Sequence, residues 1–177
     1  MSEYPVKEEE NKRIFICPCN LYKNFKRYYG RVVSFGILSV LCFVLDQYVK
    51  DLILEGFRYE GSVISIISVL NKGVAFSMFS FLGENLKWIQ LGLIVIFGYV
   101  FLVSEDLLKS YFIPFGLLIG SGASNLYDRF EYGGVVDYIF WHYKFEFAVF
   151  NLADVFINIG VGILLLIMLF WKKKREK

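Results

Sequence analysis

Four long apolar runs, separated by segments rich in polar residues, divide the sequence. They lie at about residues 32–54, 86–103, 111–125 and 151–171. About 20 residues of α-helix cross the hydrocarbon core of a bilayer, and each run approaches that length, although the apolar part of the third is short. The pattern therefore predicts an integral membrane protein, mainly α, built as a four-transmembrane-helix bundle.

The segments between the runs predict smaller elements outside the membrane core. Residues 62–70 are rich in β-branched side chains and are bounded by Gly61 and by the turn residues 71–73, a pattern typical of one or two strands. Residues 77–84 mix apolar and polar side chains, which suits a short interfacial helix.

Basic residues flank the first and last runs and predict the orientation. Lys26, Arg27 and Arg31 precede the first run, and residues 172–175 are Lys-Lys-Lys-Arg. By the positive-inside rule both termini then lie in the cytoplasm, and residues 55–85 and 126–150 face the extracytoplasmic side. We expect three parts: a flexible cytoplasmic tail over 1–30, a membrane domain over 31–171 and a basic cytoplasmic C-terminus over 172–177. A cleaved signal peptide is disfavoured, because the first run starts deep in the chain and lacks an Ala-x-Ala exit.

Composition narrows the class of partner. Hydrophobic residues make up 56% of the 177 residues, the net charge is only +2, and the mean hydropathy is +0.51. With so small a net charge the protein has no overall positive field that would attract nucleic acid, so nucleic acid is not an expected partner. Cys17 and Cys19 lack histidine partners and make a poor zinc site, while Cys42 lies in an apolar run, so we expect no metal and no cofactor.

Two carboxylates carry the candidate chemistry. Asp137 follows Val135 and Val136, and Asp154 lies about one turn inside the fourth run. An acid at the edge of hydrocarbon is costly to ionise, and two carboxylates a few ångströms apart share a proton near neutral pH. One can then activate water while the other protonates a peptide oxygen, which is the chemistry of an aspartic peptidase. A structural pair, or a helix cap at Asp154, remains the alternative.

Polar residues in five ordered blocks accompany these acids. The blocks are Asp46-Gln47-x-x-Lys50, Asn71-x-Gly73-x-Ala75-Phe76-Ser77, Asn125-x-x-Asp128-Arg129, Val135-Val136-Asp137 and Phe150-Asn151-x-Ala153-Asp154. Together they resemble the motifs of bacterial lipoprotein signal peptidase, also called signal peptidase II, over about residues 31–171. The chain departs from the family pattern at Ser124, where glycine is usual, and at Val74, where alanine is common.

The resemblance implies a membrane-embedded aspartic endopeptidase of the bacterial inner membrane. Its substrates would be diacylglyceryl-modified prolipoproteins, cleaved just before the lipidated cysteine, and globomycin-like peptides would inhibit it. The resemblance also implies an extracytoplasmic β-cradle at residues 55–71 and an interfacial helix at 77–85. Asp137 and Asp154 would be the catalytic dyad and Asn71 and Arg129 would hold the substrate. The site-supporting residues would be Asp46, Lys50, Gly73, Asn125, Asp128 and Asn151.

Other readings of the same residues stay open. His142 has no nearby serine or cysteine motif, so a surface or packed role fits it better than general base catalysis. Acids within apolar runs also mark ion pathways, which would fit a small carrier, although no inverted repeat is visible. A non-catalytic scaffold protein would tolerate Asp137→Asn and Asp154→Asn.

Overall fold

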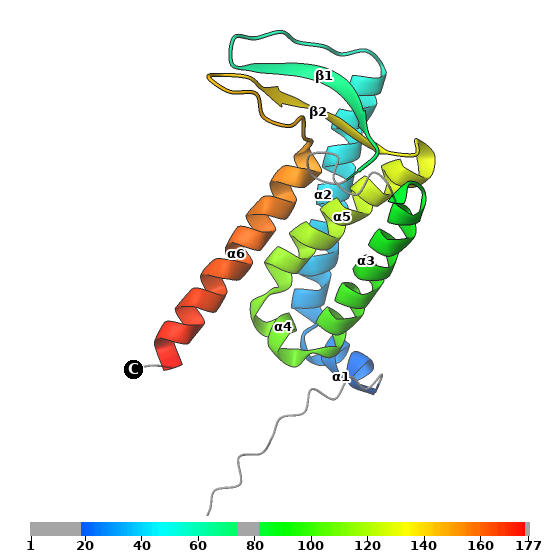
Figure 1. Ribbon diagram of the computed structural model, residues 1–177. Helices are drawn as coiled ribbons and strands as arrows, with labels where there is room; N and C mark the ends of the chain where they lie inside the picture. Colours follow the sequence, from blue (N-terminus) through cyan, green and yellow to red (C-terminus); the bar gives the residue numbers. More distant parts are fainter. Residues whose placement is uncertain (1–18, 74–81, 176–177) are drawn as a thin grey trace, which may run out of the picture.

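A computed structural model describes residues 19–73 and 82–175 of the chain, with the side chains of Cys19 and of 171–175 excepted. Six helices and two strands follow one another over these residues. They are α1 (Cys19–Arg27), α2 (Tyr29–Leu54), β1 (Ile64–Asn71), α3 (Asn85–Val103), α4 (Glu105–Ser110), α5 (Phe112–Glu131), β2 (Val135–Trp141) and α6 (Leu152–Arg175). The long helices run side by side, and the sheet covers the end of the bundle where α2 ends and α6 begins (Figure 1).

Three helices are long and apolar enough to cross a membrane. They are Tyr29–Leu54, Asn85–Val103 and the Leu152–Phe170 part of α6. Most of their large apolar side chains face outward, as expected where lipid is the solvent. Three of the four predicted spans are thus confirmed as helices of membrane-crossing length and hydropathy.

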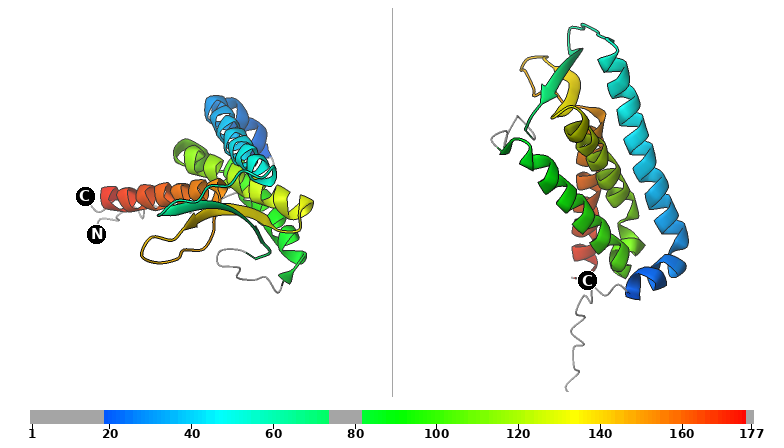
Figure 2. Two further views of the ribbon diagram at one scale, coloured as in Figure 1. Left: turned by 90° about the horizontal axis from the view of Figure 1, so that it is seen from above. Right: turned by 90° about the vertical axis from the view of Figure 1, so that its right-hand side faces the viewer.

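Helix α5 is the exception because it carries polar side chains on its inner face. It starts where the third span was predicted but continues to Glu131, six residues further, and it packs against α2, α3 and α6 (Figure 2). Ser121, Ser124, Asn125 and Asp128 are buried there among the other helices. That α5 also crosses the membrane, as the predicted third span, stays a prediction.

Glycine allows α2 and α5 to approach closely. A Cβ on Gly120 would lie 2.6 Å from the Cα of Ser39 and would also collide with its carbonyl oxygen. Ser39 Oγ donates a 3.2 Å hydrogen bond to the Gly116 carbonyl, one turn away. Small residues at a helix interface bring two backbones together, and here they align the polar faces of α2 and α5.

The two strands form an antiparallel sheet. Asn71 pairs with Val135 and Val69 with Asp137, and the register shifts between Ile66 and Val69. Beneath the sheet, Ile53 of α2 packs with Val136 and Tyr138 of β2 in the buried core. The sequence predicted β1, but β2 was missed, because its apolar residues around Asp137 were interpreted as the edge of a membrane segment.

One other expectation is corrected. Residues 19–27, predicted to belong to a flexible tail, form α1, because buried Asn24 donates hydrogen bonds to the Leu102 and Val103 carbonyls at the end of α3. The short connection between α3 and α5 contains the helix α4, whose first turn is capped by Ser104 Oγ. Residues 1–18, and most of the interfacial helix predicted at 77–85, lie outside the described residues.

Candidate active site

Asn151 is the residue at which the chain returns from the sheet into α6. Phe150 pairs with Ile139 of β2, so the next residue lies beside the strand. Asn151 Oδ1 accepts from the backbone N–H of Asp154 at 2.9 Å, and Asp154 Oδ2 accepts from the backbone N–H of Asn151 at 3.1 Å. This reciprocal pair is a capping box, and it fixes the rotamer of Asp154 relative to the helix.

Asp137 lies on β2, on the same face of the sheet as Asn71. The pairing register makes the two residues diagonal neighbours, and Asn71 Nδ2 donates to Asp137 Oδ2 at 2.9 Å. Asn151 Nδ2 donates to the other oxygen, Oδ1, at 2.8 Å. Burial raises the pKa of Asp137 from an ordinary value of 3.8 to about 6; the two amide hydrogen bonds oppose the rise and the charge of Asp154 adds to it.

Asn125 of α5 connects the two carboxylates to a buried cation. Its Nδ2 donates to Asp154 Oδ1 at 3.0 Å. Its Oδ1 accepts from Lys50 Nζ at 2.8 Å and from Asn151 Nδ2 at 3.1 Å. The orientation of this amide is therefore determined by its neighbours, and it aims a donor at Asp154.

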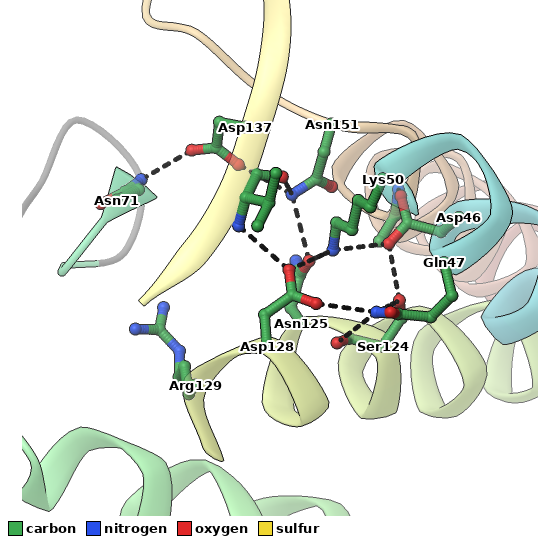
Figure 3. Close-up of polar contacts among 12 residues, drawn as sticks. Asp46, Gln47, Lys50, Asn71, Ser124, Asn125, Asp128, Arg129, Asp137 and Asn151 are labelled. Atoms are coloured by element: carbon green, nitrogen blue, oxygen red, sulfur yellow. Dashed lines mark hydrogen bonds and ion pairs between the residues drawn. The ribbon is translucent and has the colours of Figure 1, made fainter. Parts of the chain in front are cut away.

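Lys50 lies between two buried carboxylates, Asp46 and Asp128 (Figure 3). Its Nζ is 2.6 Å from Asp46 Oδ2 and 2.7 Å from Asp128 Oδ2, and all three side chains are at most 1% exposed. With the bond to Asn125 the three ammonium protons are used. Breaking such a buried pair leaves an uncompensated charge, which destabilises a protein by about 3–5 kcal/mol.

The same carboxylates join four elements of the fold. Asp46 accepts from Ser124 Oγ at 2.6 Å and from the Ala153 N–H at 2.9 Å, which joins α2 to α5 and α6. Asp128 accepts from Gln47 Nε2 at 2.7 Å and from the Val136 N–H at 3.0 Å, which joins α5 to α2 and β2. We call Asp46, Lys50 and Asp128 the ion cluster. It holds α6 and β2, the elements that carry the two acids of the cavity, against α2 and α5.

Arg129 forms a separate part of the site. Its Nε donates to Gln90 Oε1 of α3 at 2.8 Å, and its guanidinium also donates to the Gly73 carbonyl just after β1. Gln90 in turn donates to the Gly122 carbonyl at 2.9 Å. These contacts hold Arg129 in the wall of the cavity that also contains Asp137 and Asp154.

That cavity has a volume of about 530 Å³. Asn71, Asn125, Arg129 and both carboxylates give it a polar end. Apolar side chains of α3, of the segment before Asn151 and of α6 line the rest, namely Leu86, Ile89, Leu93, Phe147, Phe150 and Ile157. A cavity of this size with a few convergent polar groups fits an extended peptide segment with apolar side chains.

All ten site residues expected from the sequence lie in or around this cavity. Asn71, Asn125, Arg129, Asp137 and Asp154 line it, and the other five bond to these or to the ion cluster. Within the described residues no group of three or more His, Cys, Asp or Glu side chains is placed to hold a metal ion. His142 bonds Ser65 Oγ at 2.9 Å and is not a lining residue.

Four polar residues of the site were not among the ten site residues expected from the sequence. Gln47 and Ser124 bond the ion cluster, Gln90 orients Arg129, and Asn158 lines the cavity one turn after Asp154. Gln90 and Asn158 are amides inside long apolar runs, and a polar side chain in such a run is itself a signal of function.

Comparisons with known proteins agree with this geometry. A profile of the family described as "Signal peptidase (SPase) II" matches residues 38–170. The lipoprotein signal peptidase of Helicobacter acinonychis (strain Sheeba) is 51% identical over 139 residues, which is 78% of this chain and 88% of that protein. The lipoprotein signal peptidase of Campylobacter jejuni subsp. jejuni serotype O:2 is 52% identical over 138 residues, 77% of this chain and 88% of that protein.

A solved structure shares the fold. A bacterial membrane enzyme structure obtained by the in meso method at 2.3 Å resolution superposes with a TM-score of 0.71 at 24% identity, covering 82% of this chain and 93% of that one. This likeness shows the shared fold, while the profile match and the relatives above show the family: the chain belongs to the signal peptidase II family, membrane peptidases that remove signal peptides from lipoprotein precursors.

Proposed function

We propose that this protein is an aspartic endopeptidase that cleaves diacylglyceryl-modified prolipoproteins just before the lipidated cysteine, with Asp137 and Asp154 as its catalytic dyad. One observation carries the proposal. Both carboxylates open into the same cavity, and both accept hydrogen bonds from Asn151, while Asn125 connects them to Lys50.

The environments of the two acids suggest how they divide the work. Asp154 lies in the first turn of α6, where the helix dipole favours a negative charge, and it accepts from a backbone N–H and an amide. Burial raises the pKa of Asp137 to about 6, so this carboxyl group keeps its proton to a higher pH than an exposed one. Entry of an apolar peptide removes water and raises that pKa further. We therefore assign the base to Asp154 and the acid to Asp137.

The reaction follows from this assignment. Asp154 takes a proton from a water molecule while the oxygen of that water attacks the scissile carbonyl carbon. Asp137 gives its own proton to the carbonyl oxygen. When the tetrahedral intermediate collapses, the C–N bond breaks. Asp154 returns its proton to the departing amine of the lipidated cysteine, and Asp137 recovers the proton from the carboxyl product.

The cavity wall suggests where the substrate is held. Arg129 and Asn71 border both the polar end of the cavity and the sheet, so we place the substrate backbone against them. Apolar signal-peptide side chains would contact Leu86, Ile89 and Leu93 of α3, and the diacylglyceryl group would remain in the lipid. Globomycin-like peptides would occupy the same cavity.

We infer the following placement in the cell. Basic residues before α2 and after residue 171 place both ends of the bundle on the cytoplasmic side of a bacterial inner membrane. The sheet and the dyad lie at the opposite end of the helices (Figure 1) and would face the extracytoplasmic surface.

The test is cleavage of a purified diacylglyceryl-modified prolipoprotein by the protein in detergent. We expect Asp137→Asn and Asp154→Asn each to lower kcat by at least about 1,000-fold, because each removes a group that transfers protons in the reaction. EDTA should change nothing. The matched control is Asp106→Asn, an exposed acid on α4 at the far end of the bundle, which should cleave like wild type.

Activity that survives both substitutions, in protein with a wild-type unfolding transition, would contradict the dyad. If the wild-type protein does not cleave the substrate at all, the proposed peptidase activity is wrong. The carrier and scaffold interpretations would then replace it.

A further inference from the structure

Helix α1 lies at the end of the bundle opposite the proposed active site, and it presents three different faces (Figure 1). The first face is buried. Asn24 is 1% exposed and donates to the Leu102 and Val103 carbonyls in the last turn of α3, where carbonyl groups lack an intrahelical partner. Arg27 adds a 3.3 Å contact to Glu105 of α4. These bonds fix the position of α1 on the bundle.

The second face is apolar and exposed. Leu21, Phe25, Tyr29, Val33 and Ile37 recur every four residues, and they are 41, 47, 59, 37 and 57% exposed. Side chains four residues apart lie on one side of a helix, which applies to Leu21 and Phe25 on α1 and to the other three residues on α2. The Phe25 and Tyr29 rings join the two groups, because they touch edge to face across the turn at Tyr28 with centroids 5.5 Å apart. We call these five residues the α1–α2 stripe.

The end of the stripe that lies on α2 shows what covers it. Val33 and Ile37 belong to α2, which is long and apolar enough to cross a membrane, so lipid covers them. Because the contact between Phe25 and Tyr29 joins this end to Leu21 and Phe25, the same lipid phase extends to α1. A contiguous row of exposed apolar side chains is uncommon on a surface that faces water.

The third face is basic. Lys23, Lys26 and Arg27 are exposed on the side of α1 away from Leu21 and Phe25, and Lys26 Nζ lies 4.8 Å from the centroid of the Tyr22 ring. An amphipathic helix with aromatic and aliphatic residues on one face and Lys and Arg on the other is the pattern of a helix that lies in the membrane interface. Cations on such a helix attract anionic lipid headgroups.

We propose that α1 is an interfacial helix that binds the surface of an anionic phospholipid bilayer, with Leu21, Tyr22 and Phe25 among the acyl chains and Lys23 and Lys26 at the headgroups. The helix would hold the start of α2 at a fixed depth, and through Asn24 it would hold the end of α3 there too. This binding surface is independent of the peptidase chemistry, since it lies at the other end of the bundle.

The first test locates α1 relative to the lipid. A bimane label is placed at Leu21→Cys or, as the matched control two residues away, at Lys23→Cys, in a background in which Cys17 and Cys19 are serine and Cys42 is alanine. The labelled full-length chain is put in nanodiscs that contain brominated lipid. We expect several-fold stronger quenching at position 21 than at 23, because only position 21 belongs to the stripe.

Two results would overturn the proposal. Equal quenching at the two positions would mean that α1 does not lie in the interface. A label at position 21 that is shielded from water but not quenched by brominated lipid would mean that protein covers the stripe, either residues 1–18 or a second copy of the chain.

The second test measures the charge and needs no label. Hydrogen exchange of the α1 amides is compared in nanodiscs of phosphatidylcholine alone and with phosphatidylglycerol. We expect slower exchange in the anionic discs, with about a fivefold loss of that protection for each of Lys23→Gln and Lys26→Gln. Lys144→Gln, an exposed lysine at the sheet end, is the control. If the α1 amides exchange at the same rate in both kinds of nanodisc, α1 does not bind anionic headgroups.

Discussion

Asn151 Nδ2 donates a 2.8 Å hydrogen bond to Asp137 Oδ1, and this bond joins the first residue of the α6 cap to the middle of β2. The same side chain caps α6 through Asp154. Asn151 therefore bonds both carboxylates, Asp137 through its side-chain amide and Asp154 through its backbone N–H. Asn71 and Asn125 each add a second hydrogen bond, so both carboxylates are held in place from two sides. Such preorganisation is what an acid–base pair requires.

The pH dependence of cleavage should show the raised pKa of Asp137. Because the proposed acid must be protonated, we expect kcat/KM, which reports the free enzyme, to fall as pH rises above about 6. Asn71→Ala removes a hydrogen bond that favours the charged form, so the alkaline limb should move to higher pH. Full pH–rate profiles of both proteins measure this. An alkaline limb that stays in place in Asn71→Ala would contradict the assignment of the acid.

The same pKa predicts how stability changes with pH. A carboxyl group with a folded-state pKa above its unfolded value binds more protons in the folded protein, so the free energy of unfolding falls as pH rises between the two values. For Asp137 the rise from 3.8 to about 6 corresponds to a total fall of about 3 kcal/mol, of which about 2 kcal/mol occurs between pH 4 and 6. Unfolding in detergent across this range should show the fall in wild type and a weaker one in Asp137→Asn. Parallel curves would count against a buried, proton-binding Asp137.

Loss of the buried cation should destabilise the fold. Lys50→Met leaves Asp46 and Asp128 without a counter-ion, and we expect a loss of about 3–5 kcal/mol in the free energy of unfolding. Adding Asp128→Asn should recover part of it, because one buried charge is then removed. Lys87→Met, which breaks a surface pair with Glu84, should cost at most about 1 kcal/mol. Equal thermal shifts for the two lysine variants would contradict the role of Lys50.

Close packing of α2 on α5 should depend on Gly120. Gly120→Ala places a methyl group against the backbone of Ser39, and the two helices must separate; we expect a cost of about 1–3 kcal/mol and a fall in activity. Gly122→Ala, two residues away, meets only the Ile94 side chain, at 3.6 Å or more, and should be tolerated. Thermal unfolding and cleavage rate distinguish them. A stable, active Gly120→Ala protein would show that the α2–α5 interface can accommodate a methyl group, and the prediction would be wrong.

Asn158 should affect substrate choice and leave proton transfer unchanged. It lines the cavity one turn after Asp154, among apolar neighbours, where its amide can bond a peptide group. We expect Asn158→Leu to change KM for individual signal peptides by up to about tenfold, the value of one hydrogen bond, with an unchanged pH–rate profile. Ile159→Leu on the exposed side of α6 is the control. If all peptides respond like wild type, Asn158 does not contact substrate.

Much of the fold was predictable because its signals are local. The apolar runs fixed α2, α3 and α6 to within three or four residues, since helix formation and transfer to lipid depend on consecutive side chains. The i, i+4 spacing placed Asp46 and Lys50 on one helix face, as their 2.6 Å contact confirms. The five motif blocks, by their resemblance, also indicated the family.

The missed elements depend on contacts between distant residues. Helix α1 was missed because its polar and charged residues were interpreted as a tail. Its place on the bundle is fixed by Asn24, which bonds the end of α3, 78 and 79 positions away in the sequence. Strand β2 needs β1 as its partner, and the pairing joins residues such as Asn71 and Val135. Sequence periodicity does not report such partners.

The sequence by itself determined that this is a membrane protein with two carboxylates at the edge of apolar segments, because hydropathy and spacing are properties of consecutive residues. Only the tertiary structure decided that Lys50 pairs with Asp128 as well as Asp46, and that Asn125 and Asn151 connect this cluster to Asp137 and Asp154. The physical reason is that a buried charge needs partners on every side. Those partners come from α2, α5, β2 and α6, which meet only when the chain has folded.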